Sequence, residues 1–225
     1  MTSEKNAAVE AATKAGGAEG ASGAAGSAAI DGTKTILLVG VGGQGTILAG
    51  KLLAEVAAEA GLDVKVSEIH GMSQRGGSVS TVIRVGEHVS TMVCDEGQAD
   101  VIVAFEAVEA LRAQHYLAEG GRMFVNDEQI TPVSVNIGNA KMPERVGARL
   151  SEMGAHLLDA GVIARGLGSP KSTNVVLVGA LSTALPFDVE LWREAVRRCV
   201  PAKTVEANLA AFDAGRDAAL RGEAR

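Results

Sequence analysis

Apolar runs and amphipathic stretches alternate along most of the chain. Short apolar or alternating runs predict five β-strands, at residues 35–39, 63–69, 78–85, 99–106 and 122–127. Apolar positions at helical spacing predict five α-helices, at residues 46–61, 107–121, 172–185, 188–200 and 205–222. This alternation indicates an α/β fold, which we expect to be a Rossmann-like, open, mainly parallel sheet with helices gathered at the C-terminal end.

Two glycine-containing pairs add detail to this pattern. Gly120-Gly121 marks the expected end of the helix at 107–121. Gly86-Glu87 predicts a type II′ turn that joins the strand at 78–85 to a further strand at 88–93. We therefore expect a β-hairpin added to the parallel sheet.

The two ends of the chain differ from its middle. The first 32 residues are mostly Ala, Gly and Ser with scattered charge, and such a segment buries too little apolar surface to offset its ordering entropy. It also has no apolar core of the kind that a secretory signal needs. We expect a disordered tail at 1–32, one domain at 33–216 and a short charged tail at 217–225.

Composition and charge exclude several classes of protein. Of the 225 residues, 47% are hydrophobic and 3% aromatic, and the net charge is −6 without a basic stripe, so nucleic acid and anionic membranes are poor partners. No apolar run approaches the roughly 18 residues of a membrane span. Cys94 and Cys199 lie far apart without a CxxC spacing, which argues against a disulfide framework and against a zinc or iron–sulfur site. We expect two thiols in a reducing cytoplasm.

The sequence GVGGQG directly follows the first strand and opens the first helix. Gly40, Gly42 and Gly45 occupy the positions of a dinucleotide-type G-x-G-x-x-G turn, and Gly43 is an additional glycine. Such glycines permit the tight turn, the approach of a ligand to the backbone and close helix–strand packing. Free N–H groups and the helix dipole then favour an anion such as pyrophosphate, so we predict a ligand-binding turn at these glycines and Gln44.

Two alternatives remain open for this turn. A nicotinamide dinucleotide would require an acidic residue at the end of the second strand, about 20 residues later. Asp63 precedes that strand and Glu68 comes late in it, which weakens this interpretation. The glycines could also serve packing alone, without any ligand.

A second candidate site is the loop in EIHGMSQRGGSV, residues 68–79, which is longer and chemically richer than a plain turn requires. Arg75 could pair with a carboxylate or phosphate, and Gly76-Gly77 indicates a left-handed conformation or close approach by another backbone. No single residue is specific. Because the loop follows the second strand, we expect it near the Gly-rich turn, at the sheet edge where α/β folds bind ligands. The residues that we assign to this site are His70, Met72, Ser73, Gln74, Arg75, Gly76 and Gly77.

Three carboxylates follow predicted strands. Glu106 ends the strand at 99–106, and Glu109 lies one helical turn later. A catalytic pair is conceivable, but a first-turn pair that complements the helix dipole fits better. Asp159 ends a short expected strand and could cap a helix. No Ser/His/Asp or Cys/His group can be assembled from neighbouring strand ends, so we predict no catalytic residue and expect the chain to work with another chain.

Together these motifs resemble a known family. ILLVGVGGQGTILAGKLLAEVA and EIHGMSQRGGSVSTVIRVG resemble the gamma-type domain of the 2-oxoacid:ferredoxin oxidoreductases. The form GMSQRGG is similar to the beta-subunit type of the indolepyruvate branch. ADVIVAFEAVEALR, NVVLVGALS and VEANLAAFDAG extend the resemblance from about residue 34 to 215.

The resemblance implies a subunit of a thiamine-diphosphate enzyme that is inactive alone. Such enzymes decarboxylate an arylpyruvate oxidatively, pass electrons to ferredoxin and release an aryl-acetyl-CoA. Thiamine diphosphate, Mg and [4Fe-4S] clusters would belong to a large alpha subunit, and CoA would be the co-substrate. The Gly-rich turn would meet a CoA phosphate, while the loop at 70–77, with Glu106, would face the partner at the mouth of the active site.

Three other functions stay open at this point. The chain could be the gamma subunit of an oxidoreductase for another 2-oxoacid, such as pyruvate, 2-oxoglutarate or a branched-chain acid. It could be a structural subunit that binds no ligand. The Gly-rich turn also leaves room for an NAD-dependent dehydrogenase.

Overall fold

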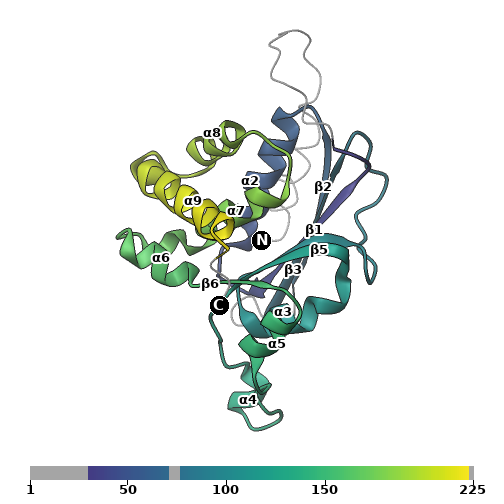
Figure 1. Cartoon of the computed structure of the whole chain (residues 1–225), viewed down its shortest axis with the longest axis vertical. Helices are drawn as coiled ribbons and strands as arrows, with labels where there is room; N and C mark the ends of the chain where they lie inside the picture. Colours follow the sequence, from purple (N-terminus) through teal and green to yellow (C-terminus); the bar gives the residue numbers. More distant parts are fainter. Residues whose placement is uncertain (1–29, 71–76, 223–225) are drawn as a thin grey trace, which may run out of the picture.

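The computed structural model describes residues 30–70 and 77–222, which form a three-layer α/β/α arrangement around one sheet (Figure 1). In these ranges the sheet has six strands in the order β2-β3-β1-β4-β5-β6. β3 runs antiparallel to β2 and β1 on its two sides, and the other five strands run parallel to one another. The expected open and mainly parallel sheet is thus confirmed. The strands are β1 (Lys34–Val41), β2 (Asp63–His70), β3 (Ser78–Gly86), β4 (Ala99–Ala104), β5 (Leu117–Asn126) and β6 (His156–Leu158).

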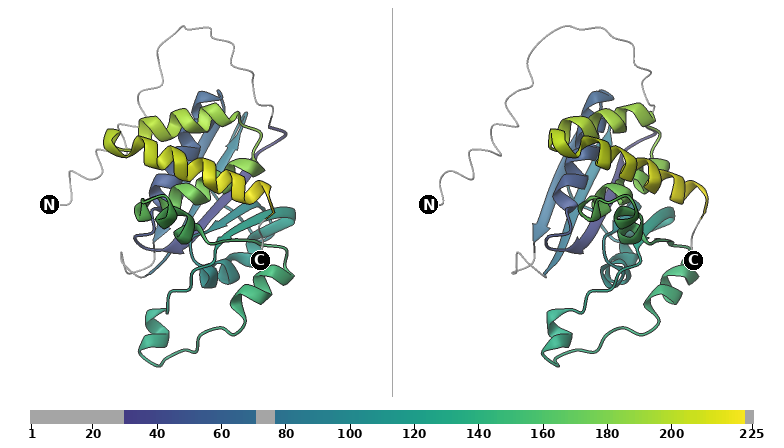
Figure 2. Two further views of the ribbon diagram at one scale, coloured as in Figure 1. Left: turned by 60° about the vertical axis from the view of Figure 1, so that its left-hand side comes forward. Right: turned by 90° about the vertical axis from the view of Figure 1, so that its left-hand side faces the viewer.

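Helices cover both faces of the sheet (Figures 1 and 2). One face carries five helices: α2 (Thr46–Glu59), α6 (Ala160–Gly166), α7 (Thr173–Leu181), α8 (Val189–Cys199) and α9 (Val205–Leu220). The other face carries α3 (Ala107–Ala113) and α5 (Val146–Glu152). A short helix α4 (Val133–Asn136) and four 3₁₀ turns complete the described part, namely η1 (Gln114–Tyr116), η2 (Pro170–Ser172), η3 (Ser182–Ala184) and η4 (Ala202–Thr204).

The apolar strand runs are explained by burial on both faces. In β1, Ile36 and Leu38 point into the core under the five helices, whereas Leu37 and Val39 point into the core under α3 and α5. Successive side chains of a strand alternate between faces, so a strand covered on both sides is apolar throughout. The same alternation holds in β4, whose residues divide between the two cores.

The hairpin expected from strands 78–85 and 88–93 is wrong, and the antiparallel hairpin of the sheet is formed by β2 and β3. β2 pairs with β3 along its whole length, and β3 also pairs with β1 over eight residues. With both edges of β3 occupied, the segment after Gly86 has no free edge to pair with, and the strand expected at 88–93 is absent. The backbone N–H of Val89 instead donates to the Asp63 carboxylate at 2.9 Å, which holds the segment at the start of β2.

The helix expected at 107–121 is shorter than its sequence pattern indicates. α3 ends at Ala113, and β5 already begins at Leu117. Gly120-Gly121 therefore lies inside a strand, where the pairing of β4 with β5 shifts between Ala99 and Val101. A Cβ atom on Gly121 would lie 3.0 Å from the Ala99 carbonyl oxygen, so glycine serves close strand approach here rather than a helix end.

Both ends of the described chain pack more closely than the expected boundaries suggest. Ile30, which falls in the expected tail, is buried in the core under the five helices. α9 continues past residue 216 to Leu220, with Ala218 and Ala219 buried. None of the helices within residues 30–70 and 77–222 is long and apolar enough to cross a bilayer.

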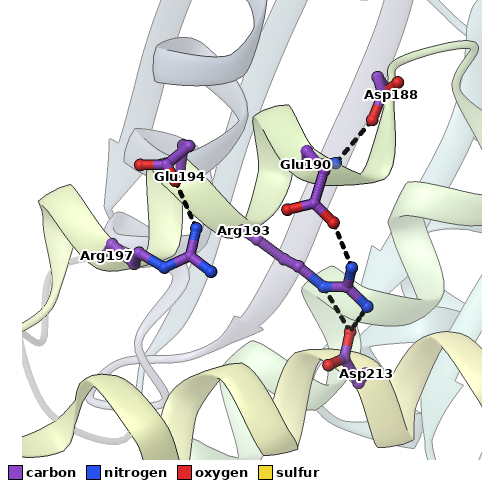
Figure 3. Close-up of polar contacts among 6 residues, drawn as sticks. All are labelled: Asp188, Glu190, Arg193, Glu194, Arg197 and Asp213. Atoms are coloured by element: carbon purple, nitrogen blue, oxygen red, sulfur yellow. Dashed lines mark hydrogen bonds and ion pairs between the residues drawn. The ribbon is translucent and has the colours of Figure 1, made fainter.

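Charged side chains join the outer helices (Figure 3). Arg193 of α8 contacts Glu190 one turn earlier and donates two hydrogen bonds to one carboxylate oxygen of Asp213 on α9, at 2.9 and 3.1 Å. Asp188 caps α8 by accepting from the Glu190 backbone at 2.7 Å. Arg198 bonds Glu59 of α2 at 3.0 Å, so α8 is tied to both of its neighbours.

Candidate functional site

The Gly-rich turn after β1 is held by its own glutamine. The Gln44 side chain accepts from the Val41 backbone N–H at 2.7 Å and donates to the Phe105 carbonyl oxygen at 3.0 Å. A Cβ atom on Gly40 would lie 2.8 Å from Gln44 Oε1 and 2.9 Å from Phe105 Cβ. Gly40 thus makes room for the glutamine, and the amide of Gln44 fixes the turn against the end of β4.

Two glycines of the turn adopt left-handed conformations. Gly43 has φ +104°, is exposed, and has no heavy atom near the position of a Cβ atom. Gly45 has φ +86°, and a Cβ atom there would overlap the Asn174 side chain at the start of α7. Gly43 therefore leaves one side of the turn open, while Gly45 lets α2 and α7 begin side by side.

This turn forms one wall of a cavity of about 590 Å³. The other walls come from the ends of β4 and β5, from α6 and from the start of α7, so the cavity lies at the carboxyl edge of the parallel strands. Its lining residues are Gly43, Gln44, Gly45, Phe105, Asn126, Glu128, Ile130, Gly161, Arg165, Pro170, Lys171, Thr173 and Asn174.

The charges around this cavity suit an anion. Arg165 and Lys171 line it, both are exposed, and neither has an ion-pair partner in the part of the chain that the structure describes. The carboxylate of Glu128 accepts a hydrogen bond from Asn126 Nδ2 at 3.0 Å. The N-terminal ends of α2 and α7 also lie at the cavity and place partial positive charge there.

The carboxylates of Glu106 and Glu109 make hydrogen bonds within the chain. Glu106 is only 1% exposed, and its two oxygens accept from the backbones of Glu109 and Ile130, both at 2.9 Å. Burial raises the pKa of this carboxyl above its ordinary value. Glu109 accepts from Ser78 Oγ at 2.6 Å and from Arg112 at 2.7 Å. Glu106 caps α3, as the helix-dipole interpretation predicts, and Glu109 ties α3 to β3.

The loop between β2 and β3 ends beside the Gly-rich turn and begins one strand further along the same edge of the sheet. β2 ends at His70 and β3 begins at Ser78, opposite Val41 of β1. The Gly42 backbone N–H donates to the Gly77 carbonyl oxygen at 2.9 Å. The expected proximity of the two segments is thus confirmed at their described ends. Met72, Ser73, Gln74, Arg75 and Gly76 lie outside the described residues.

Among the thirteen lining residues, the sequence predicts only Gly43, Gln44 and Gly45; the residues that it misses include Asn126, Arg165, Lys171, Thr173 and Asn174. Asn126 had a usable signal, because it ends a buried strand at the same edge as the Gly-rich turn. Lys171 and Asn174 belong to the polar stretch SPKSTN that opens an apolar helix, which is typical of a helix N-terminus at a ligand site. Arg165 belongs to α6, a helix that the sequence pattern does not predict, so the sequence offers no signal for this residue.

The two cysteines cannot share a metal cluster. Cys94 packs against the core under α3 and α5, and Cys199 against the core on the opposite face of the sheet. Burial raises the pKa of both thiols, which disfavours the thiolate that binds metal. No group of three His, Cys, Asp or Glu residues within 30–70 and 77–222 is placed to hold a metal ion. These residues do not fit an iron–sulfur cluster.

Comparisons with known proteins agree with this geometry. The family model described as pyruvate ferredoxin/flavodoxin oxidoreductase matches residues 35–218. Indolepyruvate oxidoreductase subunit IorB of Thermococcus kodakarensis is 44% identical over 191 residues, 82% of this chain and 95% of that protein. The subunit of the same name from Pyrococcus horikoshii shows the same identity and coverage.

A solved structure extends the agreement to three dimensions. The gamma subunit of a keto/oxoacid ferredoxin oxidoreductase from Geobacter sulfurreducens PCA superposes with a TM-score of 0.62 at 25% identity. The match covers 84% of this chain and 99% of that one. The chain therefore belongs to the pyruvate ferredoxin/flavodoxin oxidoreductase family.

Proposed function

We propose that this chain is the small subunit of an indolepyruvate:ferredoxin oxidoreductase. The observation that carries the proposal is the 44% identity to indolepyruvate oxidoreductase subunits across 95% of their length. The reaction is the oxidative decarboxylation of indolepyruvate or another arylpyruvate with CoA, which yields an aryl-acetyl-CoA, CO₂ and reduced ferredoxin. The enzyme works in the cytoplasm, where Cys94 and Cys199 stay reduced.

The decarboxylation chemistry belongs to the large partner subunit. Thiamine diphosphate with Mg supplies the carbanion chemistry there, and [4Fe-4S] clusters carry the electrons. Within the described residues of this chain, no group of three His, Cys, Asp or Glu side chains is placed to hold a metal ion. Its contribution is to bind and orient the co-substrate and to complete the mouth of the active site.

CoA is the ligand that best suits the cavity beside the Gly-rich turn. Arg165, Lys171 and the N-terminal ends of α2 and α7 attract its phosphates, and Gly43 leaves the turn open to them. Gln44 contributes indirectly, because its side chain is hydrogen-bonded to the backbones of Val41 and Phe105 and holds the turn in place for the ligand. From the sequence motif alone we propose that the loop at 70–77 meets the partner, with Arg75 as its contact to an anion or carboxylate.

The first experiment tests the assembly. The chain is expressed with and without a large subunit of the thiamine/ferredoxin type, and both preparations are assayed anaerobically with indolepyruvate, CoA and ferredoxin. Activity, iron and thiamine are expected only in the assembled enzyme. An isolated chain that turns over indolepyruvate, or a failure of the two chains to co-purify, would overturn the proposal.

The second experiment tests the anion site in the assembled enzyme. Lys171→Gln and Arg165→Gln should each weaken CoA binding about tenfold, which corresponds to one lost charge-assisted hydrogen bond. Their affinity should also depend less on salt than that of the parent. Lys141→Gln, at an exposed position away from the cavity, is the matched control. Unchanged CoA affinity in both variants would reject the anion site and favour a structural subunit that does not bind CoA.

A related 2-oxoacid is the second candidate substrate, because a keto/oxoacid ferredoxin oxidoreductase gamma subunit shares this fold over nearly its whole length. Pyruvate, 2-oxoglutarate and branched-chain 2-oxoacids are therefore assayed beside indolepyruvate in the same preparation. If one of these acids has a higher kcat/KM than indolepyruvate, that acid is the preferred substrate. Arg75→Ala should lower activity more than folding stability in either case.

A further inference from the structure

Two arginines from distant parts of the chain meet at the η3 turn. Arg122 of β5 donates to the Thr183 carbonyl oxygen at 2.8 Å and to Thr183 Oγ1 at 3.3 Å. Arg216 of α9 donates to Ser182 Oγ at 3.1 Å. Both guanidinium groups therefore contact adjacent residues of one turn. Arg122 lies four residues before the carboxyl end of β5, so this place is set back from the edge that carries the Gly-rich turn.

The positive charges of these two arginines are not compensated within residues 30–70 and 77–222. Both side chains are half-buried, and neither contacts a carboxylate there. Their hydrogen bonds go to neutral oxygens. The Arg122 guanidinium also lies over the Phe124 ring, 4.9 Å from its centroid, and burial lowers the pKa of Arg122 below its ordinary value. Removing a charge from water without a counter-ion is costly, so a carboxylate from outside the chain would be favourable here.

The surroundings of the two arginines are open to another chain. β6 pairs with residues 124–126 of β5, so among the described strands none covers the edge of β5 before residue 124. α9 contacts β6 at this corner of the molecule (Figure 1). Leu220, which is 63% exposed, lies four residues after Arg216 and therefore on the same side of α9. The surface combines two cations, an unpaired strand edge and an exposed apolar side chain.

We propose that this β5–α9 surface, defined by Arg122, Arg216 and Leu220, receives an acidic, extended segment of the large partner subunit. Guanidinium groups bind carboxylates through paired hydrogen bonds and are weakly hydrated, which suits them to protein interfaces. The open edge of β5 offers backbone hydrogen bonds to an extended segment. The net charge of −6 disfavours a polyanion such as nucleic acid, whereas a short acidic segment meets the two cations locally. The inference rests on the proposed assembly with a large subunit and adds where and how the two chains meet.

The first test measures how tightly the assembled enzyme holds together. The enzyme is prepared with the parent chain, with Arg122→Gln, with Arg216→Gln and with both substitutions, and its dissociation on dilution is followed by mass photometry at two salt concentrations. Each single substitution should weaken assembly about tenfold, and the double variant should weaken it further and depend less on salt. Equal assembly of the parent and the double variant would overturn the proposal.

The matched control is Arg149→Gln. It removes an exposed arginine from α5, which packs on the opposite face of the sheet. Assembly of this variant should stay within about twofold of the parent. If Arg149→Gln weakens assembly as much as the substitutions at η3 do, the effect follows total charge and the β5–α9 surface is wrong.

A second variant keeps the positive charge and identifies the occupant. Arg216→Lys supplies an amine, which a water-soluble carbodiimide joins to a neighbouring carboxylate as an amide while the carbodiimide takes up the water released. Mass spectrometry of the treated enzyme should find position 216 joined to an Asp or Glu of the large subunit. A link to a second copy of this chain, or no link to the large subunit, would overturn the assignment.

Folding and assembly are separated by measuring both. Arg122→Gln and Arg216→Gln each lose hydrogen bonds to η3, so thermal melting of each full chain accompanies the assembly measurement. Arg216→Lys retains the charge and should assemble within about threefold of the parent. If the parent chain itself does not assemble with a large subunit, the proposed function is wrong and this inference falls with it. If the parent assembles and the double variant assembles equally well, only the β5–α9 surface is wrong.

Discussion

Gly179 of α7 and Gly215 of α9 bring the two helix backbones into direct contact. A Cβ atom on Gly179 would overlap the Phe212 carbonyl oxygen, and one on Gly215 would overlap the Val176 carbonyl oxygen. Backbone atoms inside a helix cannot move aside as a flexible side chain can. Because α7 is buried along nearly its whole length and begins at the anion cavity, this contact also sets where that cavity lies.

Alanine at either glycine should be costly. Gly179→Ala and Gly215→Ala are each expected to lower the free energy of unfolding by about 3 kcal/mol, at the upper end of the range for overpacked cores. Gly166→Ala is the control, since a Cβ atom on Gly166 meets nothing within 4 Å. It should change stability by less than about 1 kcal/mol. Urea unfolding measures all three, and equal effects would contradict the close approach of α7 and α9.

The hydrogen bonds of Gln44 provide a separate prediction. Gln44→Met keeps the length of the side chain but leaves the Val41 N–H without its partner, and the Phe105 carbonyl oxygen keeps only the hydrogen bond from Asn126 Nδ2. The expected loss of stability is about 1–3 kcal/mol, and CoA should bind more weakly because the turn loosens. Gln98→Met serves as control, since Gln98 is exposed and makes one long bond of 3.4 Å. A Gln44→Met enzyme with parental stability and affinity would refute the positioning role.

The ion pairs of Arg193, one within α8 and one to α9, should contribute measurably to stability, in contrast to a more exposed pair. Arg193 is 31% exposed and contacts both Glu190 and Asp213 (Figure 3). Arg193→Gln is expected to cost about 0.5–1 kcal/mol at low salt, and less at high salt. Glu152→Gln removes the pair with Arg145, whose side chain is 70% exposed, and should cost close to nothing. Thermal melts at two salt concentrations distinguish these outcomes.

His156 should make stability depend on pH. Burial, followed by the positive charge of Arg122, lowers the pKa of His156 below its ordinary value of 6.5. The folded state then binds fewer protons than the unfolded state, so the stabilising contribution is present above about pH 6.5 and is lost as pH falls towards the lowered pKa. His156→Gln should flatten the stability curve in this window. The same slope in parent and variant would exclude His156, and exposed His88→Gln is the control.

The parts of the fold that sequence reasoning predicts correctly are those with local signals. β1 and β4 appear as apolar runs because both of their faces are buried, and the Gly-rich turn appears between a strand and a helix. The return of the chain at Gly77 beside the Gly-rich turn also follows, since the second strand ends at the ligand edge. Each of these features can be predicted from residues that are close together in the sequence.

The features that the sequence does not reveal depend on distant residues. The strand expected at 88–93 fails because β3 already pairs with β1, a fact of the sheet order rather than of the turn Gly86-Glu87. Arg165 and Lys171 reach the Gly-rich turn from more than a hundred residues away. The resemblance implies that Glu106 faces the mouth of the site, but its carboxylate is buried and accepts from the Glu109 and Ile130 backbones, and Ile130 lies 24 residues further along the chain.

The antiparallel strand β3 has a further consequence for how such a chain can change over time. A crossover helix between β2 and the next strand would tie any change in length to the packing of a whole layer. Here the connection leaves β2 at His70 and returns through β3 at Ser78, and β2 and β3 pair with each other along their whole length. Residues can therefore be inserted, removed or exchanged at this one place without moving the sheet. The β2–β3 hairpin therefore allows the sequence of this connection to vary while the sheet stays the same.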